Sequence, residues 1–334
     1  MTIESADAFV PGPKQATRPT TAPPWEFRFR GKGGELFGIS LMNGILSVIT
    51  LGIWFAWGRV RELQFLVGNT VADGDPMSFH GRGGELFRGV VIAFFAFIVP
   101  IYALFLMSGF LDTGWSALAM VAGYALFIVL IAFATVGSLR YRLPRIEWRG
   151  IRFGFDGRSR AFLRGYLPRI LLVGVTLGFA YPFYACWRRR WILAQSRFGT
   201  EHFACDAEPG ALYPEFVVMY LLGFVTFGLT WVYYYGQQQA YLWDRSRLGA
   251  AKFSTTLTGG NWLGLMFTNG LLSLVTLGIA MPWVVVRTHR FFFEHLSLEG
   301  SLDLGAVRQR LQRSGGVGEG MLDALDLDSG LDLG

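Results

Sequence analysis

The sequence predicts a polytopic α-helical membrane protein built from about five repeats of roughly 50 residues, with short β-strands between the membrane segments. The first observation is composition. Of the 334 residues, 52% are hydrophobic and only 16% are charged, whereas an average soluble domain carries about 25% charged residues. The second is a set of long uncharged stretches, and the third is a group of short motifs that recur along the chain.

The uncharged stretches predict six membrane segments. Each stretch can hold the roughly 20 apolar residues that a membrane helix needs. Their approximate bounds are 36–57, 86–110, 115–138, 168–187, 211–235 and 262–286.

Two motifs indicate the repeat. Residues 29–37 and 79–87 are identical at seven of nine positions, fifty residues apart. A Thr-x-Gly step follows four times, at Thr50 and Gly52, Thr176 and Gly178, Thr226 and Gly228, and Thr276 and Gly278. The spacing predicts five units that open near residues 29, 79, 155, 205 and 255, the second being 26 residues longer than the others.

These units predict a membrane domain over residues 26–304, flanked by two tails. Residues 1–25 are rich in proline, and residues 305–334 are rich in glycine and alternate acidic with apolar residues. Both compositions are typical of disordered segments. The aromatic strand-like pieces that open the units are too short to stand alone, and whether they form one sheet stays open.

The number of membrane crossings has two interpretations. Six complete crossings fit the apolar lengths, but they leave many basic residues outside, against the usual cytoplasmic bias of Arg and Lys. In the alternative, the first, fourth, fifth and sixth segments are broken helices that reverse at the Thr-x-Gly step. Only 86–110 and 115–138 then span, and the loop 111–114, which has no basic residue, faces outside.

No motif predicts catalysis, a cofactor or a metal site, because the common hydrolase, phosphate-loop and paired-cysteine signatures are missing. Polar residues within the apolar segments are therefore the candidates for a pathway. Asn43 and Asn269 occupy equivalent positions, seven residues before a Thr-x-Gly step. With the threonines and glycines of those steps they are candidate pathway or helix-break residues, and hydrogen bonding between packed helices is the alternative.

Basic residues beside the apolar segments predict contacts with lipid headgroups. The candidates are Arg59, Arg61, Arg188, Arg189, Arg190 and Arg287. We therefore expect membrane lipids as partners, rather than nucleic acid. A second copy of the chain or another membrane protein remains open as a further partner.

The chain resembles the bacterial YjgN-type inner-membrane protein family. The likeness rests on Phe-x-Gly-x-Gly-Gly-Glu-Leu-Phe, on Asn43-Gly44, and on Thr50–Ile53 followed by Trp57 and Arg59. It implies a multi-pass protein of the bacterial cytoplasmic membrane with no settled activity. Two departures argue against equal roles for all units. Pro100-Ile101-Tyr102 replaces the Thr-x-Gly step in the second unit, and Gln237-Gln238-Gln239 replaces arginines in the fourth.

Three functions follow as hypotheses. The repeats and possible half-helices favour a transporter or channel for a small solute or lipid. The lack of catalytic motifs and the polar tails favour a non-enzymatic scaffold or assembly factor. A membrane enzyme, the third, needs a cluster of ionisable groups that the sequence does not show.

Overall fold

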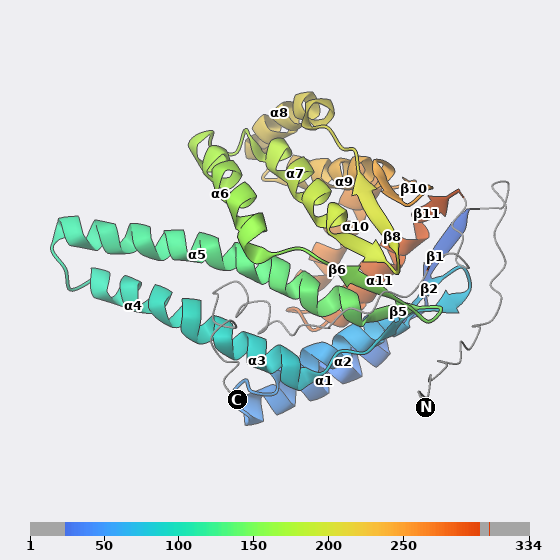
Figure 1. The fold of residues 1–334 in the computed structure, drawn as a ribbon, viewed down its shortest axis with the longest axis horizontal. Coiled ribbons are helices and arrows are strands. Elements are labelled where there is room, and N and C mark those ends of the chain that lie inside the picture. The colour runs from blue at the N-terminus through green and yellow to red at the C-terminus, as the bar shows by residue number, and fades with distance from the viewer. Residues whose placement is uncertain (1–23, 301–306, 308–334) are drawn as a thin grey trace, which may run out of the picture.

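Five helical hairpins radiate from one β-sheet in the computed structural model, which describes residues 24–300 and Val307 (Figure 1). Each hairpin lies between two strands that pair with each other in antiparallel fashion. The predicted disordered tails lie almost wholly outside the described residues.

The elements follow one another in a regular order. The first hairpin region comprises β1 (Trp25–Phe29), α1 (Gly33–Ile49), α2 (Phe55–Gly68), β2 (Thr70–Ala72) and β3 (Asp75–Pro76). The second comprises β4 (Ser78–Phe79), α3 (Gly83–Ala93), the π-helix η1 (Phe94–Ile98), α4 (Val99–Ser108), α5 (Thr113–Arg142), the 3₁₀-helix η2 (Leu143–Arg145) and β5 (Ile146–Trp148).

The remaining three regions are shorter. The third comprises β6 (Ile151–Phe155), α6 (Ser159–Val175), α7 (Tyr181–Ala194) and β7 (Ser196–Phe198). The fourth comprises β8 (Glu201–Cys205), α8 (Pro209–Val225), α9 (Leu229–Asp244) and β9 (Ser246–Leu248). The fifth comprises β10 (Ala251–Thr255), α10 (Gly259–Val275), α11 (Met281–Glu294) and β11 (Leu296–Glu299).

All eleven strands of the described chain join one sheet that nearly closes on itself. The order is β3-β2-β1-β11-β10-β9-β8-β7-β6-β5-β4, and only Met77 separates the two end strands in sequence. Alternate residues of the strands point inward and form the main core, which includes Trp25, Trp148, Phe198, Leu248 and Leu298. Strands of two to five residues are therefore stable together because they share one apolar core.

The predicted fold class is wrong in two respects. The strands, predicted as short pieces between the membrane segments with their pairing left open, form one eleven-stranded sheet. In addition, two of the six predicted segments form helices long enough to cross a bilayer within the described chain, Gly83–Ser108 and Thr113–Arg145. The segments near 36–57, 168–187, 211–235 and 262–286 each overlap two helices of 14 to 17 residues. Even 17 residues reach only about 25 Å, less than the roughly 30 Å of hydrocarbon.

The Thr-x-Gly step explains why these segments form pairs of short helices and not single long ones, because the chain reverses at this step. Leu51 and Gly52 have φ of 52° and 90°, and the other three steps repeat this pair of positive values. The Thr50 hydroxyl donates to the Leu46 carbonyl oxygen and accepts from the Trp54 backbone N–H, at 2.7 and 2.9 Å. Corresponding bonds occur at Thr176, Thr226 and Thr276. The hydroxyl thus satisfies backbone groups that the broken helix leaves free.

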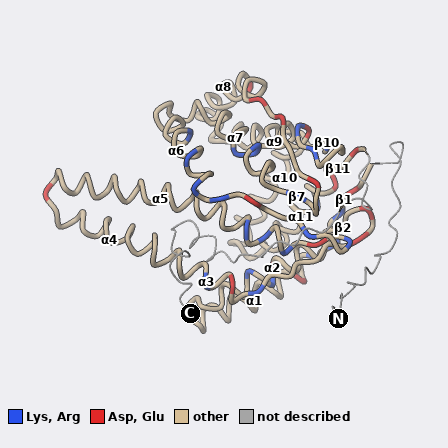
Figure 2. Tube along the Cα trace, in the orientation of Figure 1, with Lys and Arg blue, Asp and Glu red and all other residues tan. Residues whose placement is uncertain are grey.

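Charge is distributed unevenly over this fold. Figure 2 shows Lys, Arg, Asp and Glu concentrated near the sheet, whereas the outer parts of α4 and α5 are uncharged up to an acidic residue in their loop. The four hairpin turns expose apolar side chains, namely Leu51, Leu177, Phe227 and Leu277, each at least 78% exposed. Exposed apolar area of this extent is typical of a surface that contacts lipid or another protein.

Candidate functional site

Unpaired polar atoms gather at one place, between the α6–α7 hairpin and the α8–α9 hairpin. In the described part of the chain, six buried side-chain polar atoms have no hydrogen-bond partner. Three of them, Arg189 Nε, Tyr234 Oη and Gln238 Nε2, belong to residues that line two adjoining cavities in this region. Buried polar atoms are normally paired, so this concentration identifies a candidate binding site.

The first cavity, which we name the aromatic cavity, has a volume of about 350 Å³. Val173 lines it from the last turn of α6, and Gly178 lines it from the turn between α6 and α7. The other lining residues come from α7, α8 and α9, and they are Tyr181, Phe216, Tyr220, Trp231, Tyr234, Tyr235 and Gln238. Its volume lies at the lower end of the roughly 300–1,000 Å³ typical of small-molecule sites.

The second cavity, the basic cavity, has a volume of about 240 Å³ and lies between α7 and α9 nearer the sheet. Its lining includes Arg188, Arg189 and Gln239. It shares Tyr181, Tyr235 and Gln238 with the aromatic cavity. The two cavities therefore adjoin, the basic one close to the sheet and the aromatic one close to the hairpin turns.

Gln238 stands at the junction of the two cavities. Its side chain is 1% exposed. The Tyr181 hydroxyl donates to its Oε1 at 3.5 Å, whereas its Nε2 has no partner. An unpaired buried amide costs about 1–3 kcal/mol, and a ligand acceptor in the cavity would offset that cost.

Arg189 supplies a second incompletely paired group. Its guanidinium lies over the Trp243 ring, 4.0 Å from the ring centroid, and donates to the Ser246 hydroxyl at 3.4 Å. Burial lowers the pKa of Arg189 to about 10, so the group remains charged at neutral pH. Within the described residues, neither Arg188 nor Arg189 forms an ion pair. The basic cavity therefore carries uncompensated positive charge.

Asn43 and Asn269 lie elsewhere, each inside its own hairpin. Asn43 Nδ2 donates to the Gly58 carbonyl oxygen at 3.0 Å, and its Oδ1 accepts from Trp54 Nε1 at 3.4 Å. Asn269 Nδ2 donates to the Thr288 hydroxyl at 3.1 Å, while its Oδ1 is unpaired. Both amides thus form hydrogen bonds between the two helices of one hairpin. This is the helix-packing role that was the alternative to a role in a transport pathway.

The structure separates the predicted helix-break residues by their surroundings. All four threonines and four glycines form the hairpin turns. Gly178 also lines the aromatic cavity, where a Cβ would lie 3.0 Å from the Tyr220 hydroxyl. Gly278 lines a different cavity, between α1, α2 and α11.

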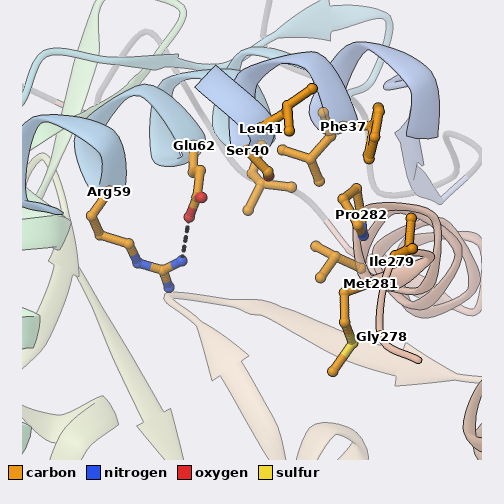
Figure 3. Close-up of a pocket in the computed structure, with 12 residues that line it drawn as sticks. Phe37, Ser40, Leu41, Arg59, Glu62, Gly278, Ile279, Met281 and Pro282 are labelled. Atoms are coloured by element: carbon orange, nitrogen blue, oxygen red, sulfur yellow. Dashed lines mark hydrogen bonds and ion pairs between the residues drawn. The ribbon is translucent and has the colours of Figure 1, made fainter. Parts of the chain in front are cut away.

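That other cavity, of about 400 Å³, also contains Arg59, one of the predicted lipid-contacting arginines. Figure 3 shows Arg59 and Glu62 pointing toward each other from α2, opposite the turn and first residues of α11. Their ion pair measures 2.9 Å. Glu62 thus compensates the positive charge of Arg59, whereas the arginines of the basic cavity have no such partner among the described residues.

The remaining predicted arginines are dispersed. Arg61 lies over the Trp54 ring at 5.2 Å, and Arg190 is exposed on α7 beside the two cavity arginines. Arg287 is exposed on α11. The six predicted arginines therefore do not form one site, although Arg188 and Arg189 share a cavity. No cluster of His, Cys, Asp and Glu that could hold a metal occurs within the described residues.

Comparison with known proteins identifies the family. A family model described as a bacterial protein of unknown function (DUF898) matches residues 24–229 and 214–324. The chain belongs to this family. The DUF898 match covers every described hairpin, including both cavities.

Named relatives of this DUF898 protein confirm the YjgN-type resemblance. Inner membrane protein YjgN of Salmonella typhimurium (strain LT2) is 31% identical over 149 residues, which is 44% of this chain and 36% of the relative. The protein of the same name from Escherichia coli K12 is 28% identical over 155 residues, 46% of this chain and 37% of the relative. The matched region thus spans little more than a third of these relatives. No solved structure matches.

The sequence analysis missed most residues of the aromatic cavity. The lining comes from two hairpins: Tyr181 lies on α7, whereas the other cavity residues on α9 are Trp231, Tyr234, Tyr235 and Gln238. Their convergence therefore depends on how the two hairpins pack. One signal was present. The replacement of arginines by Gln237-Gln238-Gln239 marks the fourth unit as different from the others.

Proposed function

We propose that this protein is a multi-pass inner-membrane transporter or channel for a small solute or lipid, and that the joined aromatic and basic cavities are its binding site. The observation that carries the proposal is the set of unpaired buried polar atoms on residues that line these cavities. The proposal involves no catalytic step. Its partners are the surrounding lipids and the bound solute.

The location and topology are part of the same proposal. The relatives named inner membrane proteins and the two long apolar helices support an inner-membrane location. In the proposed topology α3–α4 and α5 cross the bilayer, and the other four hairpins enter from the cytoplasmic side and return. The basic residues around the sheet support this orientation. The five hairpins are proposed to be copies of one repeated unit.

Half-length helices also support a transport role. Transporters commonly build their sites where helices are interrupted, because interrupted helices place polar groups within the apolar layer. Here the α6–α7 turn at Gly178 borders the aromatic cavity. The cavity therefore adjoins the turn at which the third hairpin's helix is interrupted.

The experiment is a thermal-stability screen of the full chain in detergent against a broad panel of solutes and lipids, followed by uptake into proteoliposomes. A ligand at about 100 times its dissociation constant adds about 2.7 kcal/mol of stability. We expect at least one compound to raise the melting temperature and to be transported, and Gln238→Leu to abolish both effects.

Asn43→Leu is the matched control, because Asn43 is a buried amide that lines neither cavity. It should lower the melting temperature but leave the ligand-induced increase intact. The absence of stabilisation and uptake across the whole panel would contradict the proposal. That result would favour the alternative, a non-enzymatic scaffold or assembly factor.

A further inference from the structure

The joined cavities have opposite chemistry at their two ends. At the sheet end, Arg188 and Arg189 form no ion pair with another described residue. At the other end, six of the nine lining residues are aromatic. A ligand that satisfies both ends has an anionic group and an apolar body, since a cation would be repelled and a small polar anion would leave the aromatic part unfilled.

Gln238 fixes where the two parts of such a ligand meet. Gln238 lines both cavities, and in the proposed complex its unpaired Nε2 donates to an oxygen of the anionic group. Arg189 Nε is a second unused donor near that position. Charged and neutral donors in this arrangement suit a carboxylate or a phosphate oxygen.

The rim of the aromatic cavity indicates the direction of entry. Trp231 and Tyr235 line this cavity, and both are more than 40% exposed. Trp231 is close to the α8–α9 turn, where Phe227 is 98% exposed. The opening therefore lies on the same apolar surface as the hairpin turns, which in the proposed topology faces the bilayer.

We propose that the site takes an amphipathic anion from the bilayer, with its carboxylate or phosphate bound by Arg188, Arg189 and Gln238 and its acyl chain in the aromatic cavity. This inference rests on the proposed function, because it specifies the ligand of the same site. A fatty acid and an anionic phospholipid share this chemistry.

The contrast with the α1–α2–α11 cavity supports a selective site rather than general membrane attraction. Both cavities lie between hairpins and both contain arginine. In the α1–α2–α11 cavity, Glu62 neutralises Arg59 at 2.9 Å. Of these two regions, it is the one between α7 and α9 in which positive charge adjoins both an aromatic cavity and an unpaired amide nitrogen.

The test measures binding of radiolabelled oleate to the full chain in phosphatidylcholine nanodiscs, with competition by phosphatidylglycerol, inorganic phosphate and the neutral amphiphile monoolein. We expect oleate to bind and monoolein to compete at least tenfold more weakly. Competition by phosphatidylglycerol would identify a phospholipid-compatible site, whereas its failure would restrict the site to single-chain anions. Equal competition by monoolein, or phosphate competing as well as oleate, would overturn the inference.

Three variants separate the site from surface electrostatics. Arg188→Gln and Gln238→Leu should each weaken oleate binding about tenfold or more. Arg164→Gln removes an equal charge from an exposed position of α6 that lines neither cavity, so binding should stay within about twofold. Equal losses for Arg188→Gln and Arg164→Gln would refute a specific site.

Stability and uptake provide independent measurements. Gln238→Leu should change the melting temperature of the ligand-free protein little, because removal of the unpaired Nε2 offsets the loss of the 3.5 Å hydrogen bond from the Tyr181 hydroxyl to Oε1. Oleate binding without uptake of any solute would retain this inference and refute transport. Uptake of a panel solute without oleate binding would retain the proposed function and refute this inference.

Discussion

Two glutamates at matching motif positions, Glu35 and Glu85, have different partners. Both lie in the first turn of a helix, α1 or α3, where a carboxylate interacts favourably with the helix dipole. In the structure, Glu85 also forms a 2.6 Å ion pair with Arg145, whose side chain is 4% exposed. Glu35 is exposed and forms no ion pair with another described residue. The sequence could not indicate this pair, because Arg145 follows 60 residues later.

We expect Glu85→Gln to destabilise the protein by about 1–3 kcal/mol, because it leaves the buried Arg145 without its carboxylate. This expected loss of stability is smaller than for a fully buried ion pair, because the Glu85 side chain is 37% exposed. Glu35→Gln is the matched control and should change stability by less than about 0.5 kcal/mol. Thermal unfolding of both variants in one detergent measures the difference, and equal effects would mean that the ion pair contributes nothing.

At the scale of elements, a tryptophan of one hairpin packs on a glycine of the next. Trp57 on α2 lies against Gly83 on α3, and Trp283 on α11 lies against Gly33 on α1. The Gly33-Gly34 and Gly83-Gly84 pairs begin α1 and α3. In the structure, the first glycine of each pair also provides the space that a neighbouring indole occupies.

Gly33→Ala should therefore destabilise the contact between the last and first hairpins. A Cβ at this position would lie 2.3 Å from Trp283 Cδ1, and such overpacking typically costs about 1–3 kcal/mol. At Gly34 a Cβ would meet nothing within 4 Å. Gly34→Ala should thus be neutral or stabilising by up to about 1 kcal/mol, since alanine favours helices. Similar melting temperatures for the two variants would show that Trp283 can move at little cost.

At the scale of the whole molecule, the chain closes on itself. Strand β1 pairs with β11, and α1 packs against α11, so the first and last described elements are neighbours. The charged sheet and the apolar hairpin turns then lie at opposite ends of each hairpin. This arrangement requires every linker that contributes to the sheet to be on one side of a membrane.

Cysteine labelling tests that requirement. His202→Cys and Lys252→Cys introduce exposed thiols on β8 and β10, and Asp112→Cys introduces one in the α4–α5 loop. The native Cys186 and Cys205 are both buried and are replaced by alanine as background. A membrane-impermeant thiol reagent should label Asp112→Cys from the periplasm, and His202→Cys and Lys252→Cys only after the inner membrane is opened.

Six complete crossings predict a different result. One segment, 211–235, separates His202 from Lys252, so their thiols would react from opposite sides. The hairpin topology would then be wrong. Labelling of Asp112→Cys from the cytoplasm would contradict only the crossing of α3–α4 and α5.

Sequence alone determined the membrane character and the recurring motifs, because these depend on local composition and on residues within one turn. The Thr-x-Gly step is an example, since Thr50, Leu46 and Trp54 form it by themselves. The sequence left open whether the chain crosses the membrane or reverses at the Thr-x-Gly steps. Only the tertiary structure decided that the strands form one sheet and that Arg189, Tyr234 and Gln238 face joined cavities. Those features arise from the packing of separate hairpins, and packing depends on side-chain shapes brought together over long sequence distances.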